Sequence, residues 1–128
     1  MSPPRFGRTT SDYARHRPAF APPLYERLRS FGIGLREQQI LDLGAGTGLF
    51  SRPLIEAGAT VTCVDVSAEL LAHAGRGINA AAEMLPFADA TFDVVCAAQC
   101  WHWFDRDHAP REINRVLKPG AALAVVYQ

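Results

Sequence analysis

The sequence has few features typical of a membrane, secreted or nucleic-acid-binding protein. Its 13 basic and 13 acidic residues balance to a formal net charge of zero, so overall charge provides no attraction for a nucleic acid. No apolar run approaches the roughly 18 residues of a membrane span. The polar and basic opening residues, 1–18, contain no apolar signal-peptide core. We therefore expect a cytoplasmic protein that binds neither nucleic acid nor membrane.

Cysteine is scarce, and its spacing does not suit a metal or redox site. The three cysteines, Cys63, Cys96 and Cys100, form no C-x-x-C pair. Cys63 and Cys96 lie in apolar runs typical of strands, so buried reduced thiols are expected. The four histidines show no spacing typical of a ligand pair, and no metal site is expected.

Apolar strand-like runs alternate with helical patterns along the chain. Helices are expected between the prolines at 22–23 and the glycines at 32 and 34, and over residues 47–58, 68–76 and 105–118. Strands are expected over residues 38–44, 59–67, 92–100 and 121–128, and a weaker strand that runs into a loop is expected over residues 77–87. The alternation predicts an α/β fold with a parallel sheet covered on both faces. Residues 1–12 are expected to be a flexible tail ahead of one domain at 13–128.

Three residues mark expected helix boundaries. Ser67 is suited to be the N-cap of the helix at 68–76. Pro119 and Gly120 are expected to end the helix at 105–118.

Three glycines at alternate positions, Gly44, Gly46 and Gly48, directly follow the first strand-like run. Glycine permits positive φ and has no Cβ, so a ligand can lie against the main chain. A tight strand-to-helix turn without a ligand is the alternative. In doubly wound sheets the ligand lies beyond the carboxyl ends of the strands, which is where this loop, Asp65 and residues 99–104 are expected.

A dinucleotide or a nucleoside triphosphate matches this loop poorly. The fingerprint G-x-G-x-x-G requires a glycine where this chain has Leu49 or Ser51, although Asp65 follows Gly44 at the expected distance of about 20 residues. No Gly-Lys-Ser/Thr of a P-loop follows. Asp42, two residues before the first glycine, would repel a phosphate and suits a ligand with a positively charged group.

These features together resemble the class I methyltransferases that use S-adenosylmethionine. The nearest branch is typified by quinone-biosynthesis and trans-aconitate methyltransferases. D-x-G-x-G-x-G matches at 42–48, and Asp65 matches the acid that ends the second strand. "DYARHRP", "AEMLPFADATFDVV" and "REINRVLKPG" resemble further family segments. The resemblance runs from about residue 12 to the end and implies a doubly wound, mainly parallel, Rossmann-like sheet of order 3-2-1-4-5 in three αβα layers.

The resemblance also implies a cofactor site for S-adenosylmethionine. Asp42 would orient the ammonium group, and the backbone of the glycine loop would lie along the methionine moiety. Asp65 would accept both ribose hydroxyls or would only be a charge at a helix N-terminus. The implied cofactor-binding residues are Tyr13, Arg17, Asp42, Gly44, Ala45, Gly46, Gly48, Asp65, Val66, Ala82, Glu83, Met84, Leu85 and Gln99.

The adenine and the methionine ends of this site carry open alternatives. Val66 and Leu85 would sandwich the adenine, and Met84 would do the same or belong to the core. Main-chain groups at Ala82 and Glu83 would contact the edge of the base. Where the family often has an acid that bonds the adenine amino group, this chain has Ala81. The Glu83 side chain either substitutes for that acid or is a solvated charge.

Four residues are expected near the reacting end of the site. Gln99 would contact the cofactor through its main chain. Tyr13 and Arg17 would close over the cofactor, with Arg17 pairing with the methionine carboxylate, or would belong to a solvated basic stretch. His102 is the candidate catalytic base; the alternative is a structural histidine packed by its aromatic neighbours.

The expected function is methyl transfer to a small-molecule acceptor. A non-catalytic S-adenosylmethionine-binding module or fragment is the alternative, and an NAD(P)-dependent oxidoreductase is a third. The family usually continues with two strands of a C-terminal hairpin, which this chain lacks. The apolar segment 121–128 would then be an exposed sheet edge. Either the chain is a fragment or a partner covers that edge, and a homodimer through it is expected.

Overall fold

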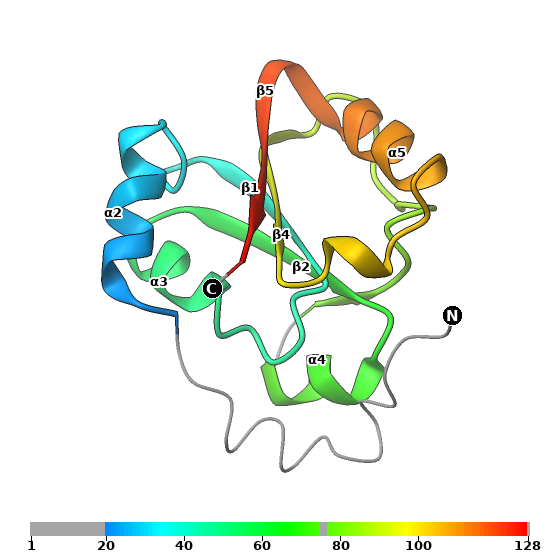
Figure 1. The fold of residues 1–128 in the computed structure, drawn as a ribbon, viewed down its shortest axis with the longest axis horizontal. Helices are drawn as coiled ribbons and strands as arrows, with labels where there is room; N and C mark the ends of the chain where they lie inside the picture. The colour runs from blue at the N-terminus through cyan, green and yellow to red at the C-terminus, as the bar shows by residue number, and fades with distance from the viewer. Residues whose placement is uncertain (1–19, 75–76, 128) are drawn as a thin grey trace.

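The computed structural model describes residues 20–74 and 77–127 (Figure 1). The expected flexible tail at 1–12, together with Tyr13 and Arg17, lies outside the described residues. All three cysteines are buried and free, as expected. No helix within the described ranges has the length and apolarity required to cross a bilayer.

Five parallel strands form one sheet in the order β3-β2-β1-β4-β5, which confirms the predicted topology. The strand at the centre, β1, pairs with β2 on one side and with β4 on the other. The chain therefore reverses its direction of winding beside β1, where doubly wound folds bind their ligands. The strands are β1 (Gln39–Leu43), β2 (Thr60–Asp65), β3 (Ile78–Asn79), β4 (Phe92–Ala98) and β5 (Leu117–Val126).

Helices cover both faces of the sheet, giving the expected three layers (Figure 1). One face is covered by α2 and α3, and the opposite face by α5, while α4 packs against β2 and β3. A 3-10 turn, η2, follows β4. The helical elements are α2 (Pro22–Ser30), α3 (Ser51–Glu56), α4 (Ala68–Ala74), η2 (Trp101–Trp103) and α5 (His108–Val116).

The central strand is buried on both faces, which explains its unbroken apolar run. Ile40 packs with α2 and α3, whereas Leu41 packs with α5, because successive side chains of a strand point to opposite faces. Both side chains are fully buried. Each such residue contributes about 1.5–3 kcal/mol of burial free energy, so the strand that carries the glycine loop is firmly anchored.

The end of α5 differs from the expectation that Pro119 and Gly120 terminate it. The helix ends at Val116, and Leu117 already pairs with Phe92 as the first residue of β5. The strand register then shifts, so that Pro119 and Gly120 lie within an irregular segment of β5 rather than ahead of it. The pairing of Leu117 at the sheet edge therefore ends the helix earlier than the local breaker signal.

The third strand is short. It contains only Ile78 and Asn79, at the start of the segment 77–87 in which a weaker strand was expected to run into a loop. An antiparallel bridge between Ala81 and Met84 turns the chain away from the sheet directly afterwards.

The expected N-cap of α4 is present, because the amide of Leu70 donates to Ser67 Oγ at 3.2 Å.

Candidate active site

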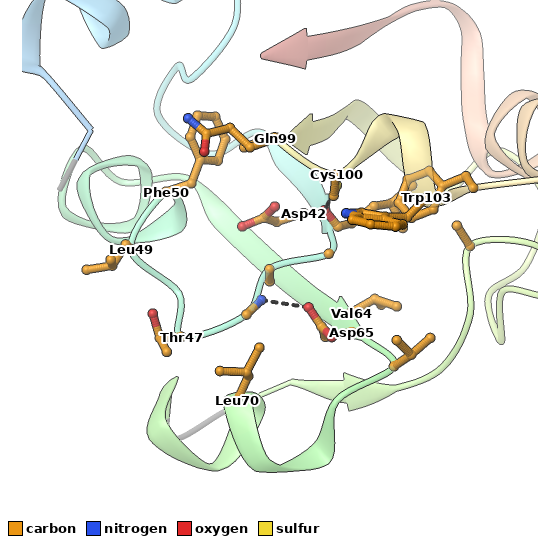
Figure 2. Close-up of a pocket in the computed structure, with 18 of the residues that line it drawn as sticks. Asp42, Thr47, Leu49, Phe50, Val64, Asp65, Leu70, Gln99, Cys100 and Trp103 are labelled. Carbon is orange, nitrogen blue, oxygen red and sulfur yellow. Dashed lines mark hydrogen bonds between the residues drawn. The ribbon is translucent and has the colours of Figure 1, made fainter. Parts of the chain in front are cut away.

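A cavity lies at the carboxyl ends of the central strands, where the sequence predicted a ligand (Figure 2). The glycine loop, the end of β2, residues 80–83 and the segment after β4 form its walls. The expected site residues that line it are Asp42, Gly44, Ala45, Gly46, Asp65, Val66, Ala82, Glu83 and Gln99.

Four expected site residues lie away from the cavity lining. Met84 is 79% exposed, whereas Leu85 is buried and packs in the core beneath α5. Gly48 borders a smaller neighbouring cavity. His102 is exposed on η2, with its ring centroid 4.5 Å from that of Trp103 and 6.3 Å from that of Tyr127.

The glycine loop has the backbone conformation that glycine allows and other residues avoid. Gly44 and Gly46 have φ values of +65° and +57°. A Cβ on Gly44 would lie 2.6 Å from Cys100 Sγ, so this position has no space for a side chain. The amide of Gly46 donates to Asp65 Oδ2 at 2.8 Å, joining the loop to the end of β2 (Figure 2).

Asp42 is a buried carboxyl group with unused acceptor capacity. It is 1% exposed, and its Oδ2 accepts a hydrogen bond from the Ser51 hydroxyl. Its Oδ1 is buried with no partner in the described structure. Burial, and then the nearby charge of Asp65, raise the pKa of Asp42 to about 7, although the bond from Ser51 lowers it. A cationic donor in the cavity would supply the missing partner and stabilise the ionised form.

Asp65 is held by two main-chain amides. Its Oδ2 accepts from Gly46 and its Oδ1 from Ser67, both at 2.8 Å. The second bond places the carboxylate at the start of α4, as the helix-terminus alternative expects. Because each carboxylate oxygen has two acceptor sites, both oxygens can still accept one more hydrogen bond from a ligand.

An aromatic wall that the sequence analysis did not single out closes one side of the cavity. The rings of Phe20 and Phe50 meet edge to face at 5.3 Å, and Tyr25 stacks on Phe50 at 5.7 Å. The Tyr25 hydroxyl donates to the Phe50 carbonyl at 2.9 Å. Phe20 and Phe50 line the cavity. No local pattern brings these residues together, because tertiary packing alone does so.

The segment after β4 lies at the cavity, where residues 99–104 were expected. Gln99 has a φ of +58°, and the chain then turns so that Cys100 and Trp103 line the cavity (Figure 2). The Cys100 thiol donates to the Leu43 carbonyl at 3.1 Å. Burial, followed by the charges of Asp42 and Asp65, raises the pKa of this thiol to about 12, so it is not a nucleophile at neutral pH. The sequence signal for Cys100 and Trp103 is that their segment follows a strand directly.

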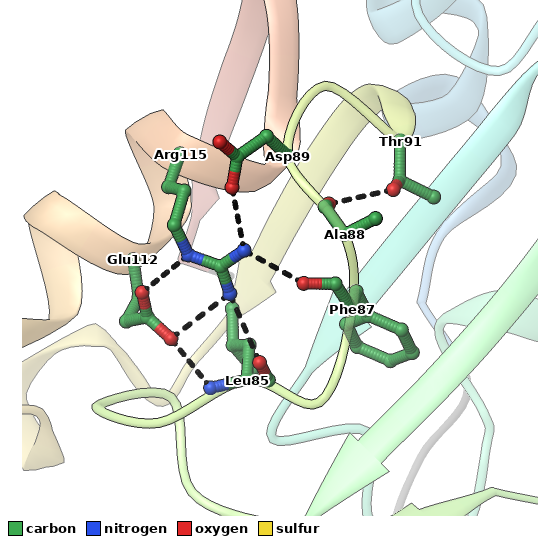
Figure 3. Close-up of polar contacts among 7 residues, drawn as sticks. All are labelled: Leu85, Phe87, Ala88, Asp89, Thr91, Glu112 and Arg115. Carbon is green, nitrogen blue, oxygen red and sulfur yellow. Dashed lines mark hydrogen bonds and ion pairs between the residues drawn. The ribbon is translucent and has the colours of Figure 1, made fainter.

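Arg115 of α5 fixes the loop that follows residues 80–83 (Figure 3). Its guanidinium donates to the carbonyls of Leu85 and Phe87 at 3.0 and 2.7 Å. It also pairs with Glu112 and Asp89. Glu112 in turn accepts from the Leu85 amide at 2.8 Å. The loop that borders the cavity is therefore attached to α5 at several points.

A match to the family described as "Methyltransferase domain" covers residues 41–125. The chain belongs to this methyltransferase family. The matched range includes the glycine loop, Asp65 and the segment after β4, which together form most of the cavity. The resemblance to class I methyltransferases expected from the sequence is thereby confirmed.

Individual methyltransferases support the same assignment. An uncharacterized methyltransferase of Mycobacterium tuberculosis is 35% identical over 95% of this chain and 51% of that protein. A malonyl-[acyl-carrier protein] O-methyltransferase of Enterobacter lignolyticus is 35% identical over 93% of this chain and 50% of that protein. The crystal structure of an S-adenosylmethionine-dependent methyltransferase from Aquifex aeolicus matches with a TM-score of 0.71 and 26% identity, over 79% of this chain and 61% of that chain. The chain spans about half the length of the curated relatives.

Proposed function

We propose that this domain binds S-adenosylmethionine in the cavity and promotes transfer of its methyl group to a small-molecule acceptor. The observation that carries the proposal is the buried Oδ1 of Asp42, which has no partner among the described residues and belongs to a carboxyl group that lines the cavity. A buried acceptor of this kind favours a ligand with a positively charged donor. The ammonium group of S-adenosylmethionine is such a donor.

The cavity residues fit the remaining parts of this cofactor. Asp65, held by the amides of Gly46 and Ser67, would accept hydrogen bonds from the ribose hydroxyls. Val66 would pack against the adenine, and the main chain of Ala82 would face the edge of the base. The bound cofactor supplies an activated methyl group, and the protein contributes alignment with the acceptor, which is a large part of the rate advantage of an in-line displacement.

The candidate base, His102, is a separate part of the proposal. It is exposed beside Trp103, which does line the cavity. An acceptor that requires proton removal by His102 would therefore have to extend from the cavity past Trp103 to the neighbouring ring on η2.

Calorimetry with S-adenosylmethionine, S-adenosylhomocysteine and NAD tests the cofactor. Binding of the first two without NAD is expected, and NAD binding alone would favour the oxidoreductase alternative. A methyl-transfer assay against a library of small-molecule acceptors tests catalysis. Cofactor binding without any methyl transfer would favour the alternative of a non-catalytic binding module.

We also propose a cytoplasmic location and a homodimer formed through β5.

Replacing Asp65 with alanine is expected to weaken S-adenosylhomocysteine binding. Loss of a charge-assisted hydrogen bond costs about 1.5–3 kcal/mol, which is roughly 10- to 100-fold in affinity. Calorimetric titration measures the change. Asp107→Ala removes an exposed aspartate at the start of α5 that does not line the cavity, and is the matched control. Equal affinities for the Asp65 variant and the wild type would remove Asp65 from the site.

Valine at position 46 is expected to abolish cofactor binding. Gly46 has a φ of +57°, and a β-branched side chain there would be strained and would fill space at the cavity. Gly32→Val is the matched control, because Gly32 has a φ of +78° but no atom within 4 Å of an added Cβ. Both variants should lose stability in thermal unfolding, and only Gly46→Val should lose S-adenosylhomocysteine binding. Normal ligand binding by the Gly46 variant would show that the glycines are needed only for the turn.

A further inference from the structure

We propose that Ser51 is a positioning residue of the candidate cofactor site and that it acts through Asp42. Its hydroxyl holds the Asp42 carboxyl group in place and leaves Oδ1 for the positively charged group of the ligand. This inference rests on the proposed function, because it concerns the same site. The sequence analysis did not single out Ser51, which follows the last glycine of the loop by three residues.

The first observation is a buried polar contact that joins three elements. Ser51 is the first residue of α3 and is 1% exposed. Asp42 of β1 and Cys63 of β2 are register partners in a parallel pair. The Ser51 hydroxyl donates to Asp42 Oδ2, and Ser51 Oγ lies 3.4 Å from Cys63 Sγ. Ser51 therefore links α3 to both central strands at the position of Asp42.

The second observation concerns the direction of the Ser51 proton. A serine hydroxyl has one proton to donate, and two acceptors lie within its reach. The Cys63 sulfur is a weak acceptor, whereas a carboxylate is a strong one. The proton is therefore directed to Asp42, and the Cys63 thiol can donate to Ser51 Oγ in return.

The third observation is the division of labour between the two carboxyl oxygens of Asp42. The terminal torsion of an aspartate is broad, and the bond from Ser51 restrains it at Oδ2. Oδ1 is buried without a partner in the described structure, and the residue lines the cavity (Figure 2). A carboxyl group that is already restrained loses less conformational entropy when a ligand binds. Ser51 thus presents Oδ1 to the ligand.

The charges around Asp42 give the Ser51 hydroxyl a second effect. Burial raises the pKa of Asp42 to about 7, the bond from Ser51 lowers it, and the charge of Asp65 raises it. No lysine or arginine of the described chain lines the cavity. Arg52 and Glu56 are exposed and border the small cavity beside Ser51. Burial raises the pKa of the remaining titratable neighbours further above neutrality: Tyr25, Cys96 and Cys100. Ser51 is therefore the group that favours the ionised form of Asp42 before a ligand binds.

Calorimetric titration with S-adenosylhomocysteine from about pH 5 to about pH 8.5 tests this role. Without the hydroxyl, Ser51→Ala should raise the pKa of Asp42 and move the affinity profile up by about one pH unit. Its affinity should be about fivefold lower than that of the wild type at pH 7. It should also still rise between pH 7 and pH 8, where the wild type is nearly constant. Ser51→Gly, a second variant without the hydroxyl, should shift the profile in the same direction.

Two matched variants separate the hydroxyl from packing. Ser51→Thr retains a hydroxyl and should keep the wild-type profile. Ser30→Ala removes the hydroxyl of an exposed serine at the end of α2 and should also leave the profile unchanged. A loss of packing alone would lower the affinity equally at every pH.

A double variant tests whether Ser51 acts through Asp42. In Asp42→Asn the carboxylate is absent, so adding Ser51→Ala should change the affinity by no more than about twofold and introduce no pH dependence. Carboxyl-carbon NMR of the unliganded protein measures the titration of Asp42 without any ligand. Its midpoint should lie at a higher pH in Ser51→Ala than in the wild type.

The outcomes separate this role from the proposed function. A wild-type pH profile and Asp42 midpoint in both variants without the hydroxyl would overturn the role of Ser51 and leave cofactor binding intact. An equal loss of affinity at every pH, or the same loss in the Asp42→Asn background, would also overturn it. A folded wild type that binds neither S-adenosylmethionine nor S-adenosylhomocysteine would overturn the proposed function, and this inference with it.

Discussion

S-Adenosylhomocysteine is expected to bind more tightly as the pH rises from 5 to 7, with little further change above pH 7. The cause is Asp42, whose burial raises its pKa to about 7 in the unliganded protein. Below that pH the carboxyl group is mostly protonated and attracts the ligand's ammonium group weakly. In the complex the cation favours the ionised form and lowers the pKa. Affinity should therefore rise by up to about tenfold per pH unit below pH 7.

The raised pKa of Asp42 gives the free energy of unfolding a pH dependence opposite in sign to that of ligand affinity. Asp42 holds its proton up to about pH 7 in the folded protein, whereas its ordinary pKa is 3.8. The folded state thus binds more protons than the unfolded state between these two values. The contribution of Asp42 to the free energy of unfolding is fully present below pH 3.8 and falls as the pH rises through 7.

Asp42→Asn provides the control for the pH dependence of binding. This variant has no titrating group at position 42, so its affinity should be lower at pH 7 and nearly constant from pH 5 to 7. Of the other titratable groups around Asp42, burial raises the pKa of Tyr25, Cys96 and Cys100 far above this range. Calorimetry at a series of pH values measures the slope. A wild type with no slope, or an asparagine variant with the wild-type slope, would show that Asp42 does not face the ammonium group.

Self-association of the 128-residue chain is the second large expected effect. In the described sheet β5 is paired only with β4. Leu123, Val125 and Tyr127 are 38%, 41% and 59% exposed, and residues 121–127 carry no charge. An uncharged apolar edge with unpaired backbone groups promotes pairing with another strand. Dimers or larger species should therefore dominate as the protein concentration rises.

Sedimentation across a concentration series tests this expectation. Val125→Lys places a charge on the exposed apolar side of β5 and should shift the protein toward the monomer. Phe31→Lys is the matched control, because Phe31 is 70% exposed but lies at the end of α2. Monomers at every concentration, or an equal effect of both substitutions, would contradict association through β5.

The parts of the fold that depend on local patterns could be predicted from the sequence. The alternation of apolar runs with helical segments predicted the parallel α/β sheet, and the family resemblance implied its strand order. The glycines at 44 and 46 predicted a loop of positive φ at the cavity. Features set by tertiary contacts could not be predicted in the same way. Leu117 ends α5 by pairing at the sheet edge, and the wall of Phe20 and Phe50 joins segments that are distant in the sequence.

The site residues show the same division. Asp42 could be singled out from its spacing to the glycines, but its fully buried state and unpartnered oxygen depend on the surrounding strands. Leu85 has the apolar character suited to an adenine contact, yet its amide is bonded to Glu112 and its side chain belongs to the core. Whether the side chain of a loop residue faces the cavity depends on long-range hydrogen bonds, and no short sequence motif specifies these.

The bonds from Arg115 have a consequence for local opening of the structure. They join residues 85–89 to α5 through the carbonyls of Leu85 and Phe87 and the carboxylate of Asp89. Releasing either segment alone would break most of these bonds, so the loop and the helix should open together as one cooperative unit. Ligand binding at the cavity would then suppress hydrogen exchange in α5, although α5 itself does not line the cavity.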